Sequence, residues 1–271
     1  MSHRYRVVAF PTARNPIVDT LEQGKRRHHV HGFGEVDVTE LRRRMHALGE
    51  LPGGAPSLTA YLVWCLGQAL GEFPEIQAFR RGRKLYLFED VDVSTIVERE
   101  TADGLKMPVT KIVRGANRLD YAAVHAQIRD AQRVQMNGIS LGDGKEARMA
   151  RRFARLPRWV RALVWWKMRR NPVFAKSMIG TANVTAVGMF GAKGGWAMGP
   201  SIWPISLLVG GMLKRPAVVE DRVEIREFLA LTMAIDHETV DGAPAARFAT
   251  RLVELIETGE GLPPVPERAE G

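Results

Sequence analysis

The last third of the chain constrains the fold most strongly, because strand-like segments follow one another there with little between them. Runs rich in apolar and β-branched residues, typical of strands, cover residues 181–189, 205–213, 218–225 and 228–236, with a turn expected at Glu220 and Asp221. An amphipathic stretch at residues 243–258 follows and predicts a helix. A sheet of this size must bury one face against helices, so we predict an α/β fold with a mixed β-sheet and helices packed on it.

The first two thirds of the chain supply both kinds of element. The patterns predict strands at residues 4–10, 31–38, 76–80, 84–88, 91–98 and 105–113, and helices at residues 39–48, from a cap at Ser57 or Thr59 to residue 70, and at 119–135. The second of these helices is apolar nearly all round and is expected at the centre of the core. Since neither a repeat nor a linker interrupts the sequence, we predict one domain over residues 1–260 and a disordered, Pro-rich tail over residues 261–271.

Length and composition exclude several classes of protein. A chain of 271 residues can bury a large core. It contains no apolar run of the roughly 18 residues that a membrane-spanning helix requires, and its N-terminus does not resemble a signal peptide. We therefore expect a cytoplasmic protein. The single cysteine, Cys65, cannot form an internal disulfide and lies in an apolar run, so we predict that it is a buried core residue.

The positive charge is concentrated in one segment. The net charge is +9, and ten lysines and arginines lie within residues 145–170, interleaved with tryptophan, phenylalanine and leucine and divided by Pro157. Such a segment is typical of a helix pair with a solvated basic face, of a surface that binds an anionic membrane or a protein, or of a nucleic-acid contact. No known nucleic-acid motif accompanies it, so nucleic acid is the least expected partner.

The stretch MAIDHETVDGAPAARF, residues 233–248, places several chemically versatile residues together. His237 follows an apolar run and precedes Asp241 and Gly242, after which a helix is predicted. A histidine at a strand end, followed by an acid and a glycine at a turn, could hold its imidazole in a cleft or simply make structural hydrogen bonds. His28, His29 and His31 also cluster, but no acid or cysteine completes a ligand set, so we predict no metal site.

The same stretch carries a resemblance to a known family. HETVDG has the H-x-x-x-D-G form and resembles the catalytic domain of dihydrolipoamide acyltransferases, the core components of 2-oxo acid dehydrogenase complexes, and the related chloramphenicol acetyltransferases. EVDVTELRRRM, LGEFPEIQAF, a strand pair ending in GLKMPV, and GTANVTAVGMFG resemble that family in the same order, so the resemblance covers about residues 26–259. It implies a chloramphenicol acetyltransferase-like fold. The domain looks freestanding, without a lipoyl domain, and residues 145–172 look like a basic, Trp-rich helical insertion.

The resemblance also implies an activity and its residues. It implies acyl transfer between coenzyme A, as co-substrate, and a dihydrolipoyl-type thiol or another small acceptor. His237 would act as general base and Thr185 would donate a hydrogen bond to the oxyanion, with Thr181 as a nearby competitor for that role. Asp241 would support the site through an ion pair with Arg26, or with Arg27 next to it, and Gly242 would permit a tight turn. Thr185 could instead be an ordinary strand residue.

The family pattern further implies an assembly. The active site lies between subunits of a trimer in that family, so a homotrimer is expected here, with the thiol carried by a lipoyl-bearing protein. The alternative is a trimeric scaffold without catalytic activity that binds a protein partner or an anionic membrane through the basic insertion. Part of the positive charge could also attract the phosphates of coenzyme A.

Overall fold

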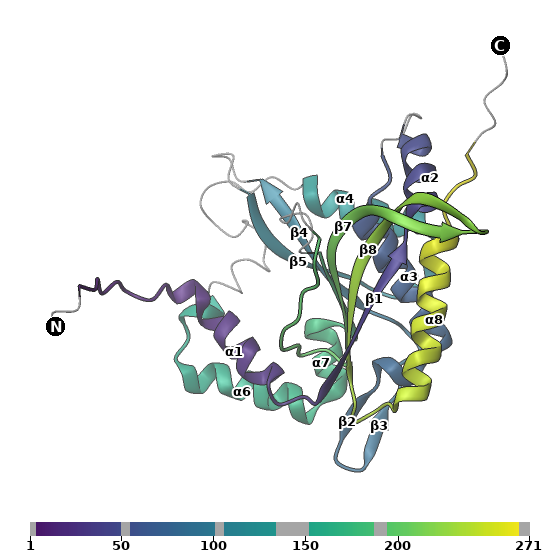
Figure 1. Ribbon diagram of the computed structural model, residues 1–271. Helices are drawn as coiled ribbons and strands as arrows, with labels where there is room; N and C mark the ends of the chain where they lie inside the picture. Colours follow the sequence, from purple (N-terminus) through teal and green to yellow (C-terminus); the bar gives the residue numbers. More distant parts are fainter. Residues whose placement is uncertain (1–3, 50–54, 101–105, 134–151, 187–193, 266–271) are drawn as a thin grey trace.

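A computed structural model describes residues 4–49, 55–100, 106–133, 152–186 and 194–265 of the chain (Figure 1). Within these ranges, six strands form one mixed sheet in the order β1-β8-β7-β6-β4-β5. Its strands are β1 (His29–Asp37), β4 (Val93–Glu100), β5 (Lys106–Val113), β6 (Ala182–Ala186), β7 (Ile205–Val219) and β8 (Arg222–Asp236). β6 runs parallel to β4 and β7, and the other neighbours are antiparallel. The predicted mixed sheet is confirmed.

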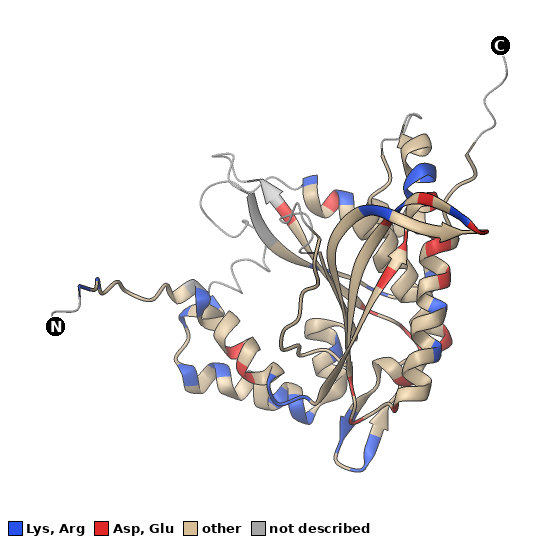
Figure 2. Ribbon diagram, in the orientation of Figure 1, with Lys and Arg blue, Asp and Glu red and all other residues tan. Residues whose placement is uncertain are grey.

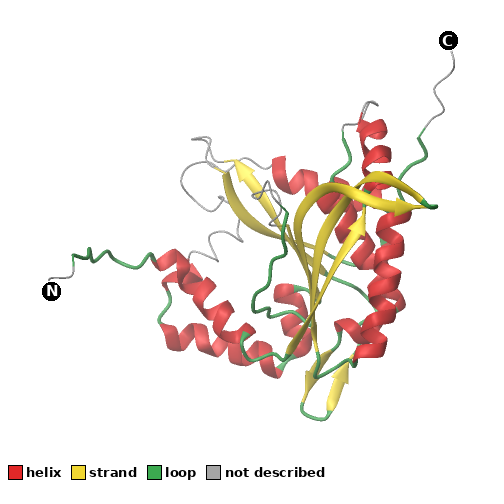
Figure 3. Ribbon diagram, viewed as in Figure 1, coloured by secondary structure: helices red, strands yellow, loops and turns green. Residues whose placement is uncertain are grey.

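Helices lie on both sides of this sheet (Figure 3). They are α1 (Asn15–Gly24), α2 (Thr39–Gly49), α3 (Leu58–Glu72), α4 (Tyr121–Arg133), α6 (Arg158–Arg170), α7 (Pro172–Ile179) and α8 (Gly242–Thr258). A separate small hairpin consists of β2 (Phe79–Arg81) and β3 (Lys84–Tyr86). None of the helices in the described part of the chain is long and apolar enough to cross a membrane.

The main core lies between the sheet and the helices α2, α3, α4 and α8. α3 is buried nearly all round, as predicted, and the Ser57 side chain caps it by accepting a hydrogen bond from the Ala60 N–H. The Tyr61 hydroxyl donates a 2.6 Å hydrogen bond to the Leu255 carbonyl and so ties α3 to α8. Cys65 is fully buried, and burial raises the pKa of its thiol, which removes it as a nucleophile at neutral pH.

β7 and β8 form one long hairpin in place of the three separate strands predicted for residues 205–236. Each strand has 15 residues, and the predicted turn at Glu220 and Asp221 is present. Both turn residues have positive φ, which is the conformation of a tight hairpin turn. The register shifts between Val209 and Met212, where an irregularity such as a β-bulge interrupts the ladder and the pairing of β7 with β8 resumes beyond it.

A second, smaller cluster lies on the other side of the molecule, under α6 and α7. It consists of Phe79, Trp165, Met168, Ala175 and Ile202. Pro157 lies immediately before α6, in agreement with the prediction that it divides the basic segment. α6 is therefore packed on its own domain through one face.

The N-terminal region differs from the prediction. Residues 4–10 form no strand and are exposed, and α1 follows over residues for which no helix was predicted. Pro16 lies in the first turn of α1, where a missing N–H costs nothing. At the other end of the chain, Leu262 packs into the core within the stretch predicted as a disordered tail. The loop predicted at residues 137–144, the turn predicted at 102–104 and residues 266–271 lie outside the described residues.

Candidate active site

His237 is positioned by the pairing of β1 with β8. The two strands pair as far as His29 and Asp236, and the His237 N–H then donates to the His28 carbonyl at 2.9 Å. The chain turns immediately, with the Thr239 N–H and hydroxyl both donating to the Asp236 carbonyl. The sheet edge thus fixes the backbone of His237, while its side chain remains exposed.

One hydrogen bond determines which nitrogen of His237 carries the proton. Nδ1 lies 2.7 Å from the Val240 carbonyl oxygen. A carbonyl oxygen can only accept a hydrogen bond, so Nδ1 must be the protonated nitrogen and the donor. In the neutral ring, Nε2 therefore keeps its lone pair and can take up a proton, as a general base requires.

An apolar pocket of about 230 Å³ lies beside this imidazole. Its lining comes from β1, the end of β8 and the start of α8, and consists of Val30, Gly32, Met233, Ile235, His237, Val240, Asp241, Gly242, Ala245, Ala246 and Ala249. Glycine and alanine predominate where α8 faces the pocket. The space next to His237 therefore suits an apolar group of small cross-section.

Thr185 lies on β6, half buried, and is oriented by a neighbour that the sequence analysis did not identify. The Asn183 side-chain N–H donates to the Thr185 hydroxyl oxygen at 2.9 Å. Because that oxygen accepts from Asn183, the hydroxyl proton is free to point elsewhere. Strand alternation, which puts residues two apart on one face, was the signal that could have identified Asn183.

Thr181, the competitor for the same role, has a fully buried hydroxyl that is already engaged. It donates to Gln77 Oε1 and accepts from the Asp92 N–H at 3.1 Å. These partners anchor the start of β6 to the start of β4. Thr181 is therefore a structural residue, and Thr185 is the better candidate as a donor to substrate.

A single chain does not bring His237 and Thr185 together. Thr185 pairs with Leu208 on β7, and Leu208 pairs with Thr232 on β8, five residues before His237. Two strand spacings of about 4.8 Å and five residues at about 3.3 Å separate the two residues by about 19 Å. No small thioester group could touch both side chains within one chain.

The ion pair predicted between Asp241 and Arg26 is replaced by a different one. Arg27 Nη1 contacts Asp236 Oδ2 at 2.7 Å, and Asp236 is buried, whereas Asp241 and Arg26 are exposed and form no ion pair within the described part of the chain. Asp236, the acid that precedes His237, therefore anchors Arg27. Asp241 instead occupies the N-cap position of α8, without a side-chain capping bond.

Gly242 does not form the tight turn that was predicted for it. It begins α8, its φ is not in the left-handed region, and a Cβ built there would meet nothing within 4 Å. The conformation of a single chain therefore does not require glycine. What Gly242 contributes is open space at the wall of the apolar pocket.

Glu238, which follows His237, is held by two side chains. Its carboxylate contacts His28 Nδ1 at 2.6 Å and Arg80 Nη1 at 2.6 Å. The hydrogen bond from His28, followed by that from Arg80, lowers the pKa of Glu238. Both residues adjacent to His237 are thus fixed by ion pairs, which restricts the loop that carries the imidazole.

His29, on β1, has a defined hydrogen-bond partner. His29 Nε2 donates to the Trp203 carbonyl at 2.9 Å, and burial is the main cause that lowers the pKa of His29. In the ranges that the structure describes, no three side chains of the histidine, cysteine or acidic type are grouped to hold a metal ion.

Sequence comparison shows which known proteins share this pattern. The profile of the family described as "2-oxoacid dehydrogenases acyltransferase (catalytic domain)" matches residues 2–147 and 168–262. The lipoamide acyltransferase component of the branched-chain alpha-keto acid dehydrogenase complex of Bacillus subtilis is 25% identical over 254 residues, covering 90% of this chain and 50% of that protein. The corresponding Pseudomonas putida component is 24% identical over 251 residues. The chain spans about half the length of the curated relatives that it matches.

Solved structures share the fold. A probable dihydrolipoamide acetyltransferase from Listeria monocytogenes superposes with a TM-score of 0.67 at 19% identity, over 98% of both chains. The dihydrolipoamide acetyltransferase of Azotobacter vinelandii superposes with a TM-score of 0.65 at 19% identity, over 94% of this chain and 92% of that one. The latter structure was used to study the catalytic roles of a serine, a histidine and, four residues after the histidine, an asparagine. The predicted fold is thus confirmed.

Proposed function

The chain belongs to the 2-oxoacid dehydrogenase acyltransferase family, as a catalytic domain, and from this we propose that it transfers an acyl group between coenzyme A and a dihydrolipoyl-type thiol or another small acceptor. The observation that carries the proposal is the state of His237. Its Nδ1–H is committed to the Val240 carbonyl, and its Nε2 is left as a base beside an apolar pocket. A base placed in this way contributes about 10²–10⁴-fold to the rate.

The reaction uses two side chains of the protein. His237 Nε2 removes the proton of the attacking thiol, and the sulfur forms a bond to the thioester carbonyl carbon. The carbonyl oxygen becomes an oxyanion that accepts a hydrogen bond from the Thr185 hydroxyl. When the tetrahedral intermediate collapses, the bond to the original sulfur breaks, and the departing thiolate takes the proton back from His237 Nε2.

The separation of His237 and Thr185 supports an assembly of several chains. About 19 Å lies between them within one chain. We therefore assign His237 of one subunit and Thr185 of its neighbour to the same site. A closed ring of such head-to-tail contacts is a cyclic oligomer, for which we propose a homotrimer.

The apolar pocket provides the approach to the base. A thiol on a long, narrow arm requires a channel without bulky side chains, and small residues such as Gly242, Ala245 and Ala246 keep this one open. We assign Gly242 this role. Asp241 lies four residues after the histidine, where the Azotobacter vinelandii enzyme has an asparagine, which favours a positioning role over a second base.

The assignment is tested by replacing the base. His237→Ala should abolish transfer from acetyl, isobutyryl and succinyl coenzyme A to dihydrolipoamide, while the melting temperature stays within a few degrees of the wild type. His46→Ala, on the surface-facing side of α2, is the control and should retain activity. Unchanged transfer by His237→Ala would contradict the proposal, and so would a wild-type protein inactive with all three donors.

A second candidate function comes from the outer face of α6. Trp159, Leu163 and Trp166 follow one another at helical spacing and are 68%, 56% and 46% exposed. α6 contains no acidic residue, and lysines and arginines occur along it, three of them in its last turn (Figure 2). An aromatic stripe flanked by lysine and arginine is the pattern of a helix that lies on an anionic membrane.

Vesicle binding tests this candidate. The wild-type protein should co-sediment with vesicles that contain phosphatidylserine, less so at high salt, and Trp159→Ala together with Trp166→Ala should abolish this binding. Equal binding to neutral vesicles, or no loss in the double variant, would exclude it. Acyl transfer by the double variant should be unaffected, which separates the two functions.

A further inference from the structure

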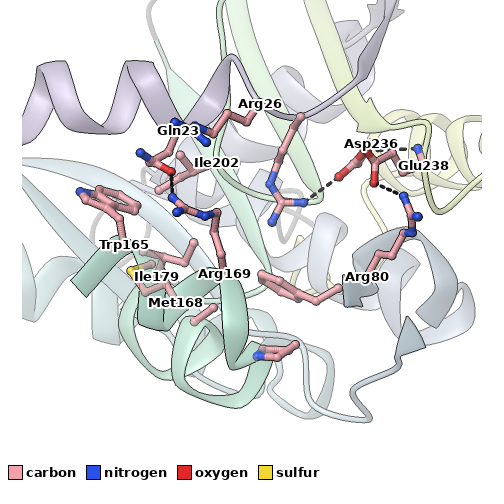
Figure 4. A pocket seen from close by; sticks show the side chains of 14 residues that line it. Gln23, Arg26, Arg80, Trp165, Met168, Arg169, Ile179, Ile202, Asp236 and Glu238 are labelled. Atoms are coloured by element: carbon pink, nitrogen blue, oxygen red, sulfur yellow. Dashed lines mark hydrogen bonds and ion pairs between the residues drawn. The ribbon is translucent and has the colours of Figure 1, made fainter. Parts of the chain in front are cut away.

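A second pocket, of about 250 Å³, lies between α1, α6, α7 and the end of β8 (Figure 4). It is lined by Gln23, Arg26, Arg27, Phe79, Arg80, Trp165, Met168, Arg169, Pro172, Ala175, Ile179, Ile202, Asp236 and Glu238. His237 is not among these residues, so the pocket is distinct from the cavity beside the imidazole.

The charges that line this pocket are not balanced. Of its four arginines, two are paired with its two carboxylates: Arg27 with Asp236 at 2.7 Å and Arg80 with Glu238 at 2.6 Å. The other two arginines, Arg26 and Arg169, lie toward the opposite end of the pocket, where Figure 4 shows Gln23 as their polar neighbour. One end is therefore neutralised, and the other has excess positive charge.

The two remaining arginines are Arg26 and Arg169. Arg169 donates to the neutral Gln23 Oε1 at 2.5 Å, and Arg26 has no ion pair within the described part of the chain. Burial, and after it the charge of Arg26, lowers the pKa of Arg169. The guanidinium groups repel each other, and an anion between them would relieve that repulsion.

The remainder of the pocket is apolar. Trp165, Met168, Ile179 and Ile202 form its apolar wall around Arg169 (Figure 4), and Trp165, Met168 and Ile202 belong to the small buried cluster. A bare inorganic anion would leave this wall without a partner. A molecule with a negative group and an apolar body of about the size of one ring matches both halves of the lining.

α6 is firmly attached to α1, so the wall that α6 contributes to the pocket is held in place. Arg161 on α6 and Asp19 on α1 form a buried pair, with Nε and Oδ2 2.6 Å apart and Nη2 and Oδ1 3.3 Å apart. Arg158 adds an exposed contact with Glu22. The family profile leaves residues 148–167 unmatched, so most of α6, including Trp165, lies outside the part of the chain that it describes.

We propose that this pocket binds a small amphipathic organic anion, with its carboxylate or phosphate held by Arg26 and Arg169 and its apolar body against Trp165, Met168 and Ile202. Arginine matches both oxyanions because its planar group donates two parallel hydrogen bonds. The inference does not depend on the acyl transfer proposed above, because none of these residues contacts the imidazole pocket.

Calorimetric titration of the full-length protein tests the proposal. Phenyl phosphate and benzoate are the probes, and at least one of them should bind. Inorganic phosphate and benzyl alcohol should each bind at least about tenfold more weakly, because the first lacks the apolar body and the second lacks the negative group. The tighter of the two probes identifies the preferred oxyanion. Absence of binding by both at millimolar concentration would overturn the proposal.

Two variants and a matched control locate the binding. Arg26→Gln and Arg169→Gln should each weaken the binding of the tighter probe about tenfold. Arg170→Gln should not, because Arg170 is the next residue on α6 but lies over the Trp166 ring, 4.4 Å from its centre, and does not line the pocket. Unchanged affinity in both variants, an equal loss in Arg170→Gln, or displacement of the probe by coenzyme A would each refute the assignment.

Discussion

At the scale of single residues, the candidate catalytic groups are each held by one hydrogen bond. The Val240 carbonyl fixes the ring of His237 and its tautomer, and Asn183 occupies the acceptor site of the Thr185 hydroxyl. Both bonds free one atom for chemistry: Nε2 as a base, and the hydroxyl proton as a donor. Without the bond from Asn183, the hydroxyl would be free to rotate.

Substitutions on β6 test this arrangement. Thr185→Ala should lower kcat for acyl transfer by about 10²–10³-fold, since it removes an oxyanion donor, and Thr185→Ser should restore most of the rate. Asn183→Ala should lower kcat by about tenfold with little change in KM, since it loosens the donor without removing it. Steady-state kinetics distinguishes these outcomes. An Asn183→Ala variant with wild-type kcat would rule out the positioning role.

The half-buried His29 of β1 makes stability depend on pH. Burial lowers the pKa of His29 in the folded protein below its ordinary value of 6.5. The unfolded chain then binds the proton more readily than the folded protein. The contribution of neutral His29 to the free energy of unfolding is therefore complete at pH values above 6.5, and it is lost as the pH falls through 6.5 toward the lowered pKa. His29→Gln should reduce the decline in unfolding free energy over this acid range, measured by urea titration at several pH values. An identical decline in wild type and variant would contradict this expectation.

At the scale of elements, the two ends of the β8 strand have different tasks. Its end at Asp236 is flanked by β1 and β7, and these strands position His237. Its start forms the tip of the long hairpin, where Val218, Val223 and Ile225 are about three-quarters exposed. An apolar tip of this kind is typical of a surface that contacts another subunit.

The attachment of α6 to α1 depends on one buried ion pair. Asp19→Ala leaves the Arg161 guanidinium buried without its partner, which costs about 3–5 kcal/mol where the surroundings cannot relax. We expect this loss to appear as faster amide exchange confined to α1, α6 and α7. Glu22→Ala removes the exposed contact with Arg158 and should cost less than about 1 kcal/mol. Equal effects of the two variants would mean that the pair does not anchor α6.

At the scale of the whole molecule, the geometry of the sheet favours a site shared between subunits. Thr185 on β6 and His237, just beyond the end of β8, are separated by two strand spacings and far along the strand direction, which supports the proposal that a neighbouring copy completes the pair. A cyclic arrangement gives each chain both roles, with its histidine at one interface and its threonine at the other.

Mixing two inactive variants tests this arrangement. His237→Ala and Thr185→Ala should each lack activity, but a mixture that is unfolded and refolded together should recover up to about a quarter of the wild-type rate per site, since random assembly restores that fraction of interfaces. Sedimentation of the wild type should give the mass of three chains. Refolded mixtures that stay inactive, despite forming mixed oligomers, would show that the site does not span two subunits.

The sequence by itself determined most of the elements. Runs of apolar and β-branched residues predicted the mixed sheet, and a segment that is apolar nearly all round predicted the buried helix α3, because these patterns are local. The stretch HETVDG, through its resemblance to a known family, made His237 the candidate base. Tertiary structure decided what depends on residues far apart in the chain. It paired Arg27 with Asp236 instead of Arg26 with Asp241, merged three predicted strands into a long hairpin, and distinguished Thr185 from Thr181 by their partners. Such choices follow from strand register and from packing across the sheet, which a local pattern does not contain.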